Sequence, residues 1–294
     1  SNLTEPLVSV IVNCHNGEKF LKECLDSVVN QTYKKWELIF WDNFSKDSSK
    51  EIFMQYNEKR FKYFHADKFT SLYTARNLAL RKASGDFISF LDTDDFWFEK
   101  KLEKQLKVFN HNRNLGIVYS NYYYYFNKSK IKKVISKKMP TGKITQQLLK
   151  HYNIGGILTA LCRRDLFKKK IFENNYEIIG DFDFFLNVSN FTYFGCVQEP
   201  LATYRLHGEN TSLKKLDLQI KELEHWLDQN KDIYLKNNYS LNGVFINLQS
   251  LKIKKNFIDG NKYRGLIEIF KFPFTIKKLK FLLIFFVPKR KTQT

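Results

Sequence analysis

Three carboxylates stand close together near the end of the first third of the chain, and their type and spacing suit metal chemistry. Asp92, Asp94 and Asp95 follow the apolar run 87–91 directly, and a second apolar run, 96–98, comes next. Crowded carboxylates repel one another, so they require a cation, a row of backbone amides or protons nearby. Oxygen ligands that leave coordination positions open for substrate phosphates are typical of Mg²⁺ and Mn²⁺ sites. The spacing therefore predicts a divalent-metal site.

A simpler interpretation assigns these acids to the start of a helix. The segment 96–109 has apolar residues at helical spacing, and acids at a helix start satisfy free amides and suit the helix dipole. Capping uses one or two acids, whereas three are present, so the metal site is favoured and capping stays open. Arg76, on the helix expected before the acidic strand, could make a forked contact with the same phosphate oxygens. An ordinary solvated arginine is the alternative.

Alternating strands and helices must position these residues. Short β-branched or aromatic runs and apolar residues at helical spacing predict strands at 7–12, 36–41, 60–66 and 87–91 and helices at 17–31 and 71–83. This alternation is typical of a mostly parallel sheet flanked by helices, an α/β fold. Ligands of such sheets bind beyond the carboxyl ends of the strands. The segment 13–16, Asp42 and Asp92 each follow a predicted strand, so we expect them at one edge.

Composition limits the classes of function. The chain has 294 residues, 43% of them hydrophobic and 16% aromatic, which indicates a folded protein with a proper core. A formal net charge of +19 predicts an anionic partner: a nucleic acid, a phosphorylated small molecule or an acidic membrane surface. The four cysteines lie far apart, which favours a reducing cytoplasm over a disulfide scaffold or zinc site. Neither a secretory signal nor a span of eighteen apolar residues is present.

Two long blocks of the chain carry a clear family resemblance. Residues 6–49 and 73–95 resemble the nucleotide-sugar-binding half of the family 2 glycosyltransferases, which are inverting enzymes with the GT-A fold. The order and spacing of four separate motifs match over about the first hundred residues. The resemblance implies a Rossmann-like, mostly parallel sheet flanked by helices. It also implies a bacterial-type glycosyltransferase of surface-polysaccharide synthesis.

The resemblance implies roles for single residues as well. In the family, the loop after the first strand and the acid after the second hold the nucleotide, and an Asp-x-Asp motif contacts ribose and metal. The matching nucleotide-sugar positions are Asn16, Asp42 facing the base, Arg76 near the diphosphate, Asp92 and Asp94. Asp94 and the adjoining Asp95 are implied metal ligands. Asn43 and Phe44 depart from the usual second acid and glycine.

Two later segments extend the match. Residues 177–189 resemble the family's acidic helix, whose aspartate is the general base and matches Asp181 here. Residues 204–212 resemble the segment that closes over the diphosphate, in which His207 would complete the metal shell. An inverting transfer needs a carboxylate to take the proton of the acceptor hydroxyl. The alternatives are an N-cap role for Asp181 and a packed or surface histidine at 207.

The rest of the chain is expected to form a second, basic region. Its last segment, 271–291, mixes lysines with phenylalanines and leucines, as a helix lying in an anionic membrane interface would. A C-terminal helix packed on the domain is the plain alternative. The expected organisation is a GT-A catalytic domain at 1–212, with a nucleotide-sugar half at 1–110 and an acceptor half at 111–212, followed by a helical extension at 213–294.

Three classes of function compete. The favoured one is a Mn²⁺- or Mg²⁺-dependent inverting transfer from a nucleoside-diphosphate sugar, with UDP as the expected carrier, to a glycan or lipid-linked glycan. An Asp-x-Asp phosphatase would want Thr or Val where Phe96 stands and would carry the motif on its first strand. A basic binding protein without catalysis rests on charge alone, and no nucleic-acid-binding signature is present. We therefore expect a cytoplasmic enzyme, peripheral on the inner face of the membrane, with no nucleic-acid partner.

Overall fold

The structure is a computed structural model that describes residues 5–126, 130–208, 215–273, 278 and 280–282. It divides into two compact units. Unit 1 comprises Ser1–Leu148 and Tyr152–Asn210, and unit 2 comprises Leu149–His151 and Thr211–Thr294. The domain boundary expected at residue 212 lies outside the described residues.

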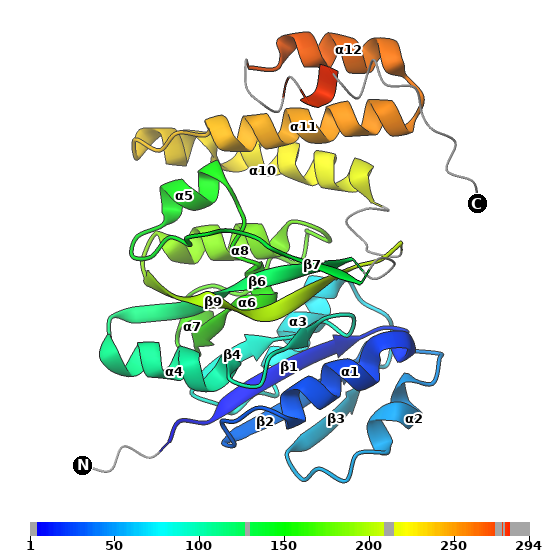
Figure 1. Cartoon of the computed structure of the whole chain (residues 1–294), viewed down its shortest axis with the longest axis vertical. Coiled ribbons are helices and arrows are strands. Elements are labelled where there is room, and N and C mark those ends of the chain that lie inside the picture. The colour runs from blue at the N-terminus through cyan, green and yellow to red at the C-terminus, as the bar shows by residue number, and fades with distance from the viewer. Residues whose placement is uncertain (1–4, 127–129, 209–214, 274–277, 279, 283–294) are drawn as a thin grey trace. The chain divides into compact units, whose positions relative to one another are not determined.

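Within the described part of unit 1, nine strands form one sheet (Figure 1). They are β1 (Val8–Cys14), β2 (Trp36–Asp42), β3 (Phe61–His65), β4 (Phe87–Phe90), β5 (Phe96–Trp97), β6 (Leu115–Phe126), β7 (Ile131–Val134), β8 (Leu161–Arg163) and β9 (Tyr193–Leu206). Their order is β3-β2-β1-β4-β8-β6-β9-β5, with β7 beside β6. The first four are mutually parallel, β8 is antiparallel to both neighbours, and β6 and β9 are parallel.

Helices cover this sheet. Those in the first 190 residues are α1 (Glu18–Val29), α2 (Ser49–Met54), α3 (Leu72–Leu80), α4 (Lys101–His111), α5 (Thr145–Lys150), α6 (Gly156–Thr159), α7 (Leu166–Lys169) and α8 (Gly180–Ser189). β1 and β2 are buried along their whole length, which explains their nearly continuous apolar sequences. Helix α3 packs against both strands. The predicted α/β fold with a mostly parallel sheet flanked by helices is confirmed.

The helix expected at 96–109 is shorter than predicted. Phe96 and Trp97 form the short strand β5, antiparallel to β9, and α4 begins at Lys101 with Lys100 as its N-cap residue. A buried tryptophan usually has a partner for its indole N–H, and that of Trp97 donates to the carbonyl of Leu158 (2.9 Å). Because the N-cap lies beyond the acidic cluster, the interpretation of these acids as helix caps is wrong.

Unit 2 is helical, and the predicted C-terminal helical extension is confirmed. It contains α10 (Leu216–Lys236), α11 (Asn242–Ile258) and α12 (Lys262–Lys271). A core of Ile253, Ile269, Phe272 and Phe281 joins α11 to α12 and the residues that follow. In the described part of the chain, every helix is too short or too polar to span a bilayer. Most of the segment 271–291, which was expected to dock on a membrane, lies outside the described residues.

Candidate active site

The carboxyl edge of the parallel strands gathers the loops that carry the predicted site residues. In the sheet register, Cys14 lies beside Asp42 and Ile11 lies beside Phe90. The loops that follow β1, β2 and β4 therefore leave the sheet as neighbours. This arrangement is what the sequence predicted from strands that end in polar residues.

Asp94 and His207 come together although 113 residues separate them. Asp94 Oδ2 lies 2.9 Å from His207 Nε2, and both side chains are partly exposed. Asp94 belongs to the loop after β4, and His207 directly follows the end of β9. Burial raises the pKa of Asp94, Asp92 raises it further, and the bond to His207 opposes both. A carboxylate oxygen and an imidazole nitrogen so close together can share one cation.

The donor set bears on whether a metal fits here. Among the described residues, no group of three or more His, Cys, Asp or Glu side chains is arranged to hold a metal ion. Asp94 and His207 thus offer two protein ligands, and phosphate oxygens and water would have to complete the shell. Mg²⁺ commonly binds through one or two carboxylates together with substrate phosphates. The residues fit a metal site that assembles with its substrate and do not form a ready-made cage.

Asp95 lies inside the protein. Its Oδ1 accepts a hydrogen bond from the backbone N–H of Arg205 (2.8 Å), and Arg205 Nε donates to the carbonyl of Asp94 (2.9 Å). Burial raises the pKa of Asp95, and the charge of Asp94 adds to the shift. These bonds attach the acidic loop to β9. Asp95 therefore supports the loop that presents Asp94, and its role as a metal ligand stays a prediction.

Arg76 is buried against the same loop. Its Nη2 donates to both oxygens of Asp92, at 2.8 and 3.1 Å, and its guanidinium lies 5.1 Å from the centre of the Tyr73 ring. In the described structure the buried Nε of Arg76 has no hydrogen-bond partner. An ordinary solvated arginine would be exposed, so that interpretation is wrong. Arg76 holds Asp92 in a fixed orientation at the edge.

Asp42 lies beneath the edge, with only 1% of its surface exposed. Tyr63 OH donates to Oδ2 (2.6 Å), the Ser45 N–H donates to Oδ1 (2.8 Å), and His65 Nδ1 is 3.5 Å from Oδ2. Burial by itself would raise the pKa of Asp42, but the bonds from Tyr63 and Ser45 lower it. Oδ1 thus supports the turn at 43–45 and Oδ2 is held by β3, and contact between Asp42 and the base of the nucleotide stays a prediction.

Asn16 links two loops of the edge. Its Oδ1 accepts the N–H of Lys46 (2.8 Å), and its own N–H donates to Ser45 Oγ (3.0 Å). Asn16 and Phe44 both adopt left-handed backbone conformations, with φ of 53° and 65°. Such strain in non-glycine residues gathers at functional sites. The sequence did not single out Ser45, whose signal is no more than a serine in the loop after a strand.

Asp181 lies in the first turn of α8, whose N-cap residue is Ile179. The N-cap interpretation of Asp181 is therefore wrong. Tyr152 OH donates to Oδ2 (3.1 Å), and the Phe182 N–H donates to Oδ1 (2.8 Å). The hydroxyl of Tyr73 lies 3.4 Å from Oδ1. Tyr152 was missed from the sequence because an isolated tyrosine carries no motif.

A glycine lies directly against the Asp181 carboxylate. Gly156 has a φ of +49°, and a Cβ at this position would lie 2.4 Å from Asp181 Oδ2 and 2.8 Å from the Tyr152 hydroxyl. Burial raises the pKa of Asp181, while the Arg76 charge, the Phe182 N–H and Tyr152 oppose the increase. A carboxylate with a raised pKa is suited to accept a proton from a hydroxyl.

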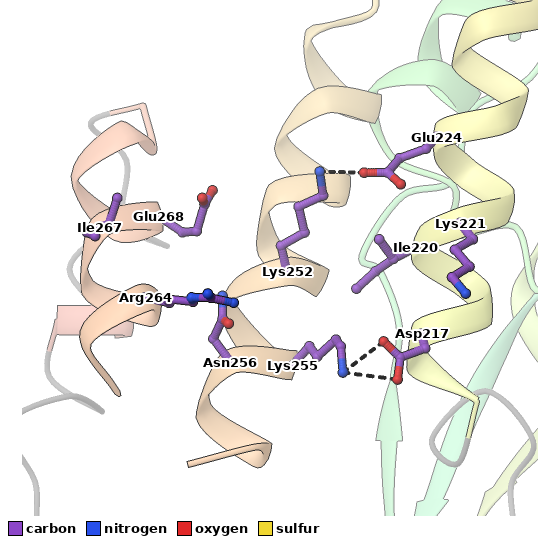
Figure 2. A pocket seen from close by; sticks show the side chains of 10 residues that line it. All are labelled: Asp217, Ile220, Lys221, Glu224, Lys252, Lys255, Asn256, Arg264, Ile267 and Glu268. Atoms are coloured by element: carbon purple, nitrogen blue, oxygen red, sulfur yellow. Dashed lines mark hydrogen bonds and ion pairs between the residues drawn. The ribbon is translucent and has the colours of Figure 1, made fainter. Parts of the chain in front are cut away.

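Unit 2 has a hollow of its own, lined by α10, α11 and α12 (Figure 2). Lys252 and Lys255 of α11 reach across to carboxylates of α10, as Figure 2 shows. Lys252 pairs with Glu224 (2.5 Å), and Lys255 pairs with Asp217 (2.8 Å). Both lysine charges are thus paired with carboxylates of the neighbouring helix.

Comparison with known proteins agrees with this geometry. Residues 9–171 match the model of Glycosyl transferase family 2. Over 158 residues the chain is 36% identical to the UDP-Glc:alpha-D-GlcNAc-diphosphoundecaprenol beta-1,3-glucosyltransferase WfgD of Escherichia coli, a match that covers 53% of this chain and 60% of that protein. The chain therefore spans less than two thirds of the length of this relative.

Two solved structures share the fold. TarS of S. aureus, in complex with UDP-GlcNAc, superposes with a TM-score of 0.62 at 15% identity, covering 95% of this chain and 79% of that one. The mannosyltransferase PcManGT of Pyrobaculum calidifontis, in complex with GDP-Man and Mn²⁺, gives 0.59 at 15% identity, covering 96% and 80%. The family model matches more than half of the chain, and the chain belongs to glycosyltransferase family 2.

Proposed function

We propose that the protein is a divalent-metal-dependent, inverting glycosyltransferase that moves a sugar from a nucleoside-diphosphate sugar to a glycan hydroxyl in surface-polysaccharide synthesis. One observation carries the proposal: the charged groups of the site lie close enough to shift one another's pKa. The charges of Arg76 and Asp92 act on Asp181, and Asp92 also acts on Asp94, which lies beside His207. The name of the Escherichia coli relative specifies UDP-Glc as donor and a diphosphoundecaprenol-linked acceptor, which supports a UDP-sugar and a lipid-linked glycan here.

The residues divide the work of the reaction. A divalent cation bound by Asp94 and His207 would neutralise the charge that develops on the departing diphosphate. The mannosyltransferase structure with Mn²⁺ supports a cation of this class. Asp92, held by Arg76, is oriented to accept hydrogen bonds from ribose hydroxyls. The buried Arg76 Nε remains as a donor for a ligand oxygen or a water.

Asp181 acts as the general base. As the acceptor hydroxyl attacks the anomeric carbon opposite the leaving group, its proton passes to the Asp181 carboxylate. The new glycosidic C–O bond forms while the bond to the diphosphate oxygen breaks, and the nucleoside diphosphate departs. Tyr152 and the Phe182 N–H each bind one oxygen of Asp181, so the carboxylate keeps its orientation during the transfer.

Donor binding and turnover test the proposal together. A nucleotide sugar in large excess over its dissociation constant should stabilise the protein by about 2.7 kcal/mol at one hundredfold saturation, and only with Mn²⁺ or Mg²⁺ present. Asp94→Asn removes one ligand charge but little volume, so it should abolish both this metal-dependent stabilisation and transfer while the protein stays folded. Full activity of Asp94→Asn, or undiminished activity in excess chelator, would disprove the metal role.

Unit 2 supports the proposed docking on an anionic membrane. Helix α12 exposes Tyr263, Ile267 and Phe270 at the spacing i, i+4, i+7, which places them on one face. The opposite face, with Gly265 and Ile269, is buried. The basic residues Lys262, Arg264 and Lys271 belong to the same helix. An exposed apolar stripe on a basic helix suits the interface of anionic lipids.

Vesicle binding tests this surface. Replacing the three stripe residues of α12 with serine should lower binding to phosphatidylglycerol-containing vesicles at least about tenfold, because roughly 25 cal/mol is lost per Å² of apolar contact. Phe245→Ser is the matched control, since it removes an exposed aromatic side chain from α11 outside the stripe. Unchanged vesicle binding by the triple variant would remove α12 from the docking surface.

A further inference from the structure

Three consecutive carbonyl groups at the end of α6 are each held by a buried side chain from the segment around the acidic loop. The bonds join Trp97 Nε1 to Leu158 O (2.9 Å), Gln105 Nε2 to Thr159 O (2.7 Å) and Ser89 Oγ to Ala160 O (2.8 Å). The donors come from β5, α4 and β4. Three elements thus converge on one short stretch of backbone.

Lys101 lies at the centre of these donors. Its Nζ donates to Gln105 Oε1 (2.9 Å) and to Ser89 Oγ (3.3 Å), and it lies 4.0 Å from the centre of a Trp97 ring. The lysine is fully buried. Gln105 Nε2 also donates to the carbonyl of Val118 (2.8 Å), so each polar atom of this glutamine has a partner. We call Ser89, Trp97, Lys101 and Gln105 the lysine network.

The lysine network lies between two parts of the proposed active site. At one end, Trp97 follows Asp95 by two residues in the chain. At the other end, α6 begins at Gly156, which lies against the Asp181 carboxylate. The Ala160 N–H donates to the Gly156 carbonyl (3.2 Å), so the carbonyls held by the network belong to the same turn as that glycine. A shift of the network would therefore change the distance between the acidic loop and Asp181.

We infer that the lysine network is a set of positioning residues that holds the turn at 156–160, and with it Asp181, at a fixed distance from Asp92 and Asp94. This inference rests on the proposed function. Attack requires reacting atoms about 3–3.5 Å apart, and a displacement of about 1 Å can cost about 10²-fold in rate. The network joins the donor-binding and acceptor-binding sides through direct hydrogen bonds. A displacement of one side would therefore displace the other.

The burial of Lys101 argues against the view that this residue serves only to stabilise the fold. A buried ammonium without a carboxylate is costly, and an apolar side chain of similar volume would avoid this cost. In the described structure, burial lowers the pKa of Lys101 to about 7, and the one titratable neighbour that acts on it is Cys162. The other groups that face its Nζ, from Ser89, Trp97 and Gln105, do not titrate. Lys101 thus holds Ser89, Trp97 and Gln105 in place, although its burial lowers the free energy of unfolding.

Lys101→Met tests the inference, because it keeps an unbranched side chain of nearly the same length and removes its donors. We expect donor-induced stabilisation to stay within about twofold of wild type while kcat for transfer falls about 10- to 100-fold. Thr145→Val is the matched control: it removes another buried side-chain bond of unit 1, to Ser189 Oγ (2.9 Å), and should leave kcat unchanged. Wild-type kcat in Lys101→Met would overturn the inference.

A second variant and a pH profile guard against misfolding of the first. Trp97→Phe removes the bond to Leu158 and should lower kcat about three- to tenfold without changing the donor KM. In wild type, kcat should show a step between pH 6 and 8 that is absent in Lys101→Met, and identical profiles would contradict the role. A wild-type enzyme that transfers from no nucleotide sugar would disprove the proposed function; equal kcat in an active wild type and its variants would disprove only the network.

Discussion

Asp42 and Asp181 have similar hydrogen-bond partners, but their pKa values are shifted in opposite directions. Each accepts a hydrogen bond from a tyrosine hydroxyl and one from a backbone N–H. The pKa of Asp42 is nevertheless lowered and that of Asp181 is raised. The tyrosine bond is 2.6 Å at Asp42 and 3.1 Å at Asp181.

The opposite pKa shifts suit the two carboxylates to different roles. At Asp42 the hydrogen bonds outweigh the cost of burial, so the carboxylate is a fixed anion that supports the turn after β2. At Asp181 burial outweighs them, so the carboxylate gains from a proton. A general base must bind a proton in the transition state, and only the second environment favours that change. Burial alone therefore does not identify a base; the balance of burial and bonds does.

Asp181→Asn tests one side of this comparison and should change the rate of transfer more than the Asp42 or tyrosine variants. Transfer should fall by about 10² or more, because the proton of the acceptor hydroxyl loses its acceptor, while donor binding stays near wild type. A raised pKa means that stability falls as pH rises above the unfolded value of about 3.9, so the variant should be as stable as wild type, or more so, at pH 7. Initial rates and melting curves check both statements. Collapse of donor binding would make Asp181 structural.

Asp42→Asn tests the other side and should act on stability. Its lowered pKa stabilises the fold above about pH 4, and this contribution is lost as pH falls through the folded-state pKa. We expect the variant to lose about 1–3 kcal/mol of unfolding free energy at pH 7, with the difference from wild type shrinking below about pH 4. Denaturant titrations at pH 7 and below about pH 4 measure this difference in unfolding free energy. An unchanged stability together with a large rise in donor KM would instead support contact between Asp42 and the base of the nucleotide.

The sequence predicted the parts of this site that rest on local patterns. Continuous apolar runs predicted β1 and β2 because both faces of these strands are buried, and the polar residues after them predicted the edge at which the candidate site lies. Phe96 and Trp97 were assigned to a helix because a short apolar run fits either period. Their strand state depends on pairing with β9, about one hundred residues later, which no local pattern records.

Long-range contacts account for the features that no local pattern predicts. His207 was identified through family resemblance, and no spacing rule would place it 2.9 Å from Asp94. The burial of Asp95 follows from its bond to the backbone of Arg205, so three adjacent acids that look equivalent in the sequence differ in the fold. Tyr152 contacts Asp181 of α8, and Lys101 contacts Ser89 of β4. A sequence motif names the reacting groups more readily than the groups that orient them.

Tyr152 and Tyr63 form a matched pair of probes, and their replacement should cause smaller changes than the aspartate variants. Tyr152→Phe removes a bond that favours ionised Asp181, so the pKa of Asp181 should rise and the acidic limb of the kcat/KM profile should move to higher pH. Above that limb the rate should fall by about tenfold, which corresponds to about 1.5 kcal/mol, the low end of the range for a hydrogen bond to a charged group.

Tyr63→Phe removes the corresponding bond from Asp42, and it should lower the melting temperature while leaving the pH profile of transfer in place. Both variants lose one hydroxyl, so volume and apolar packing are matched. The comparison of the two carboxylates requires the two responses to differ in kind: a displaced profile for one tyrosine and a lower melting temperature for the other. If Tyr63→Phe displaced the acidic limb as far as Tyr152→Phe, Asp42 would take part in proton transfer, and the division between a fixed anion and a working base would fail.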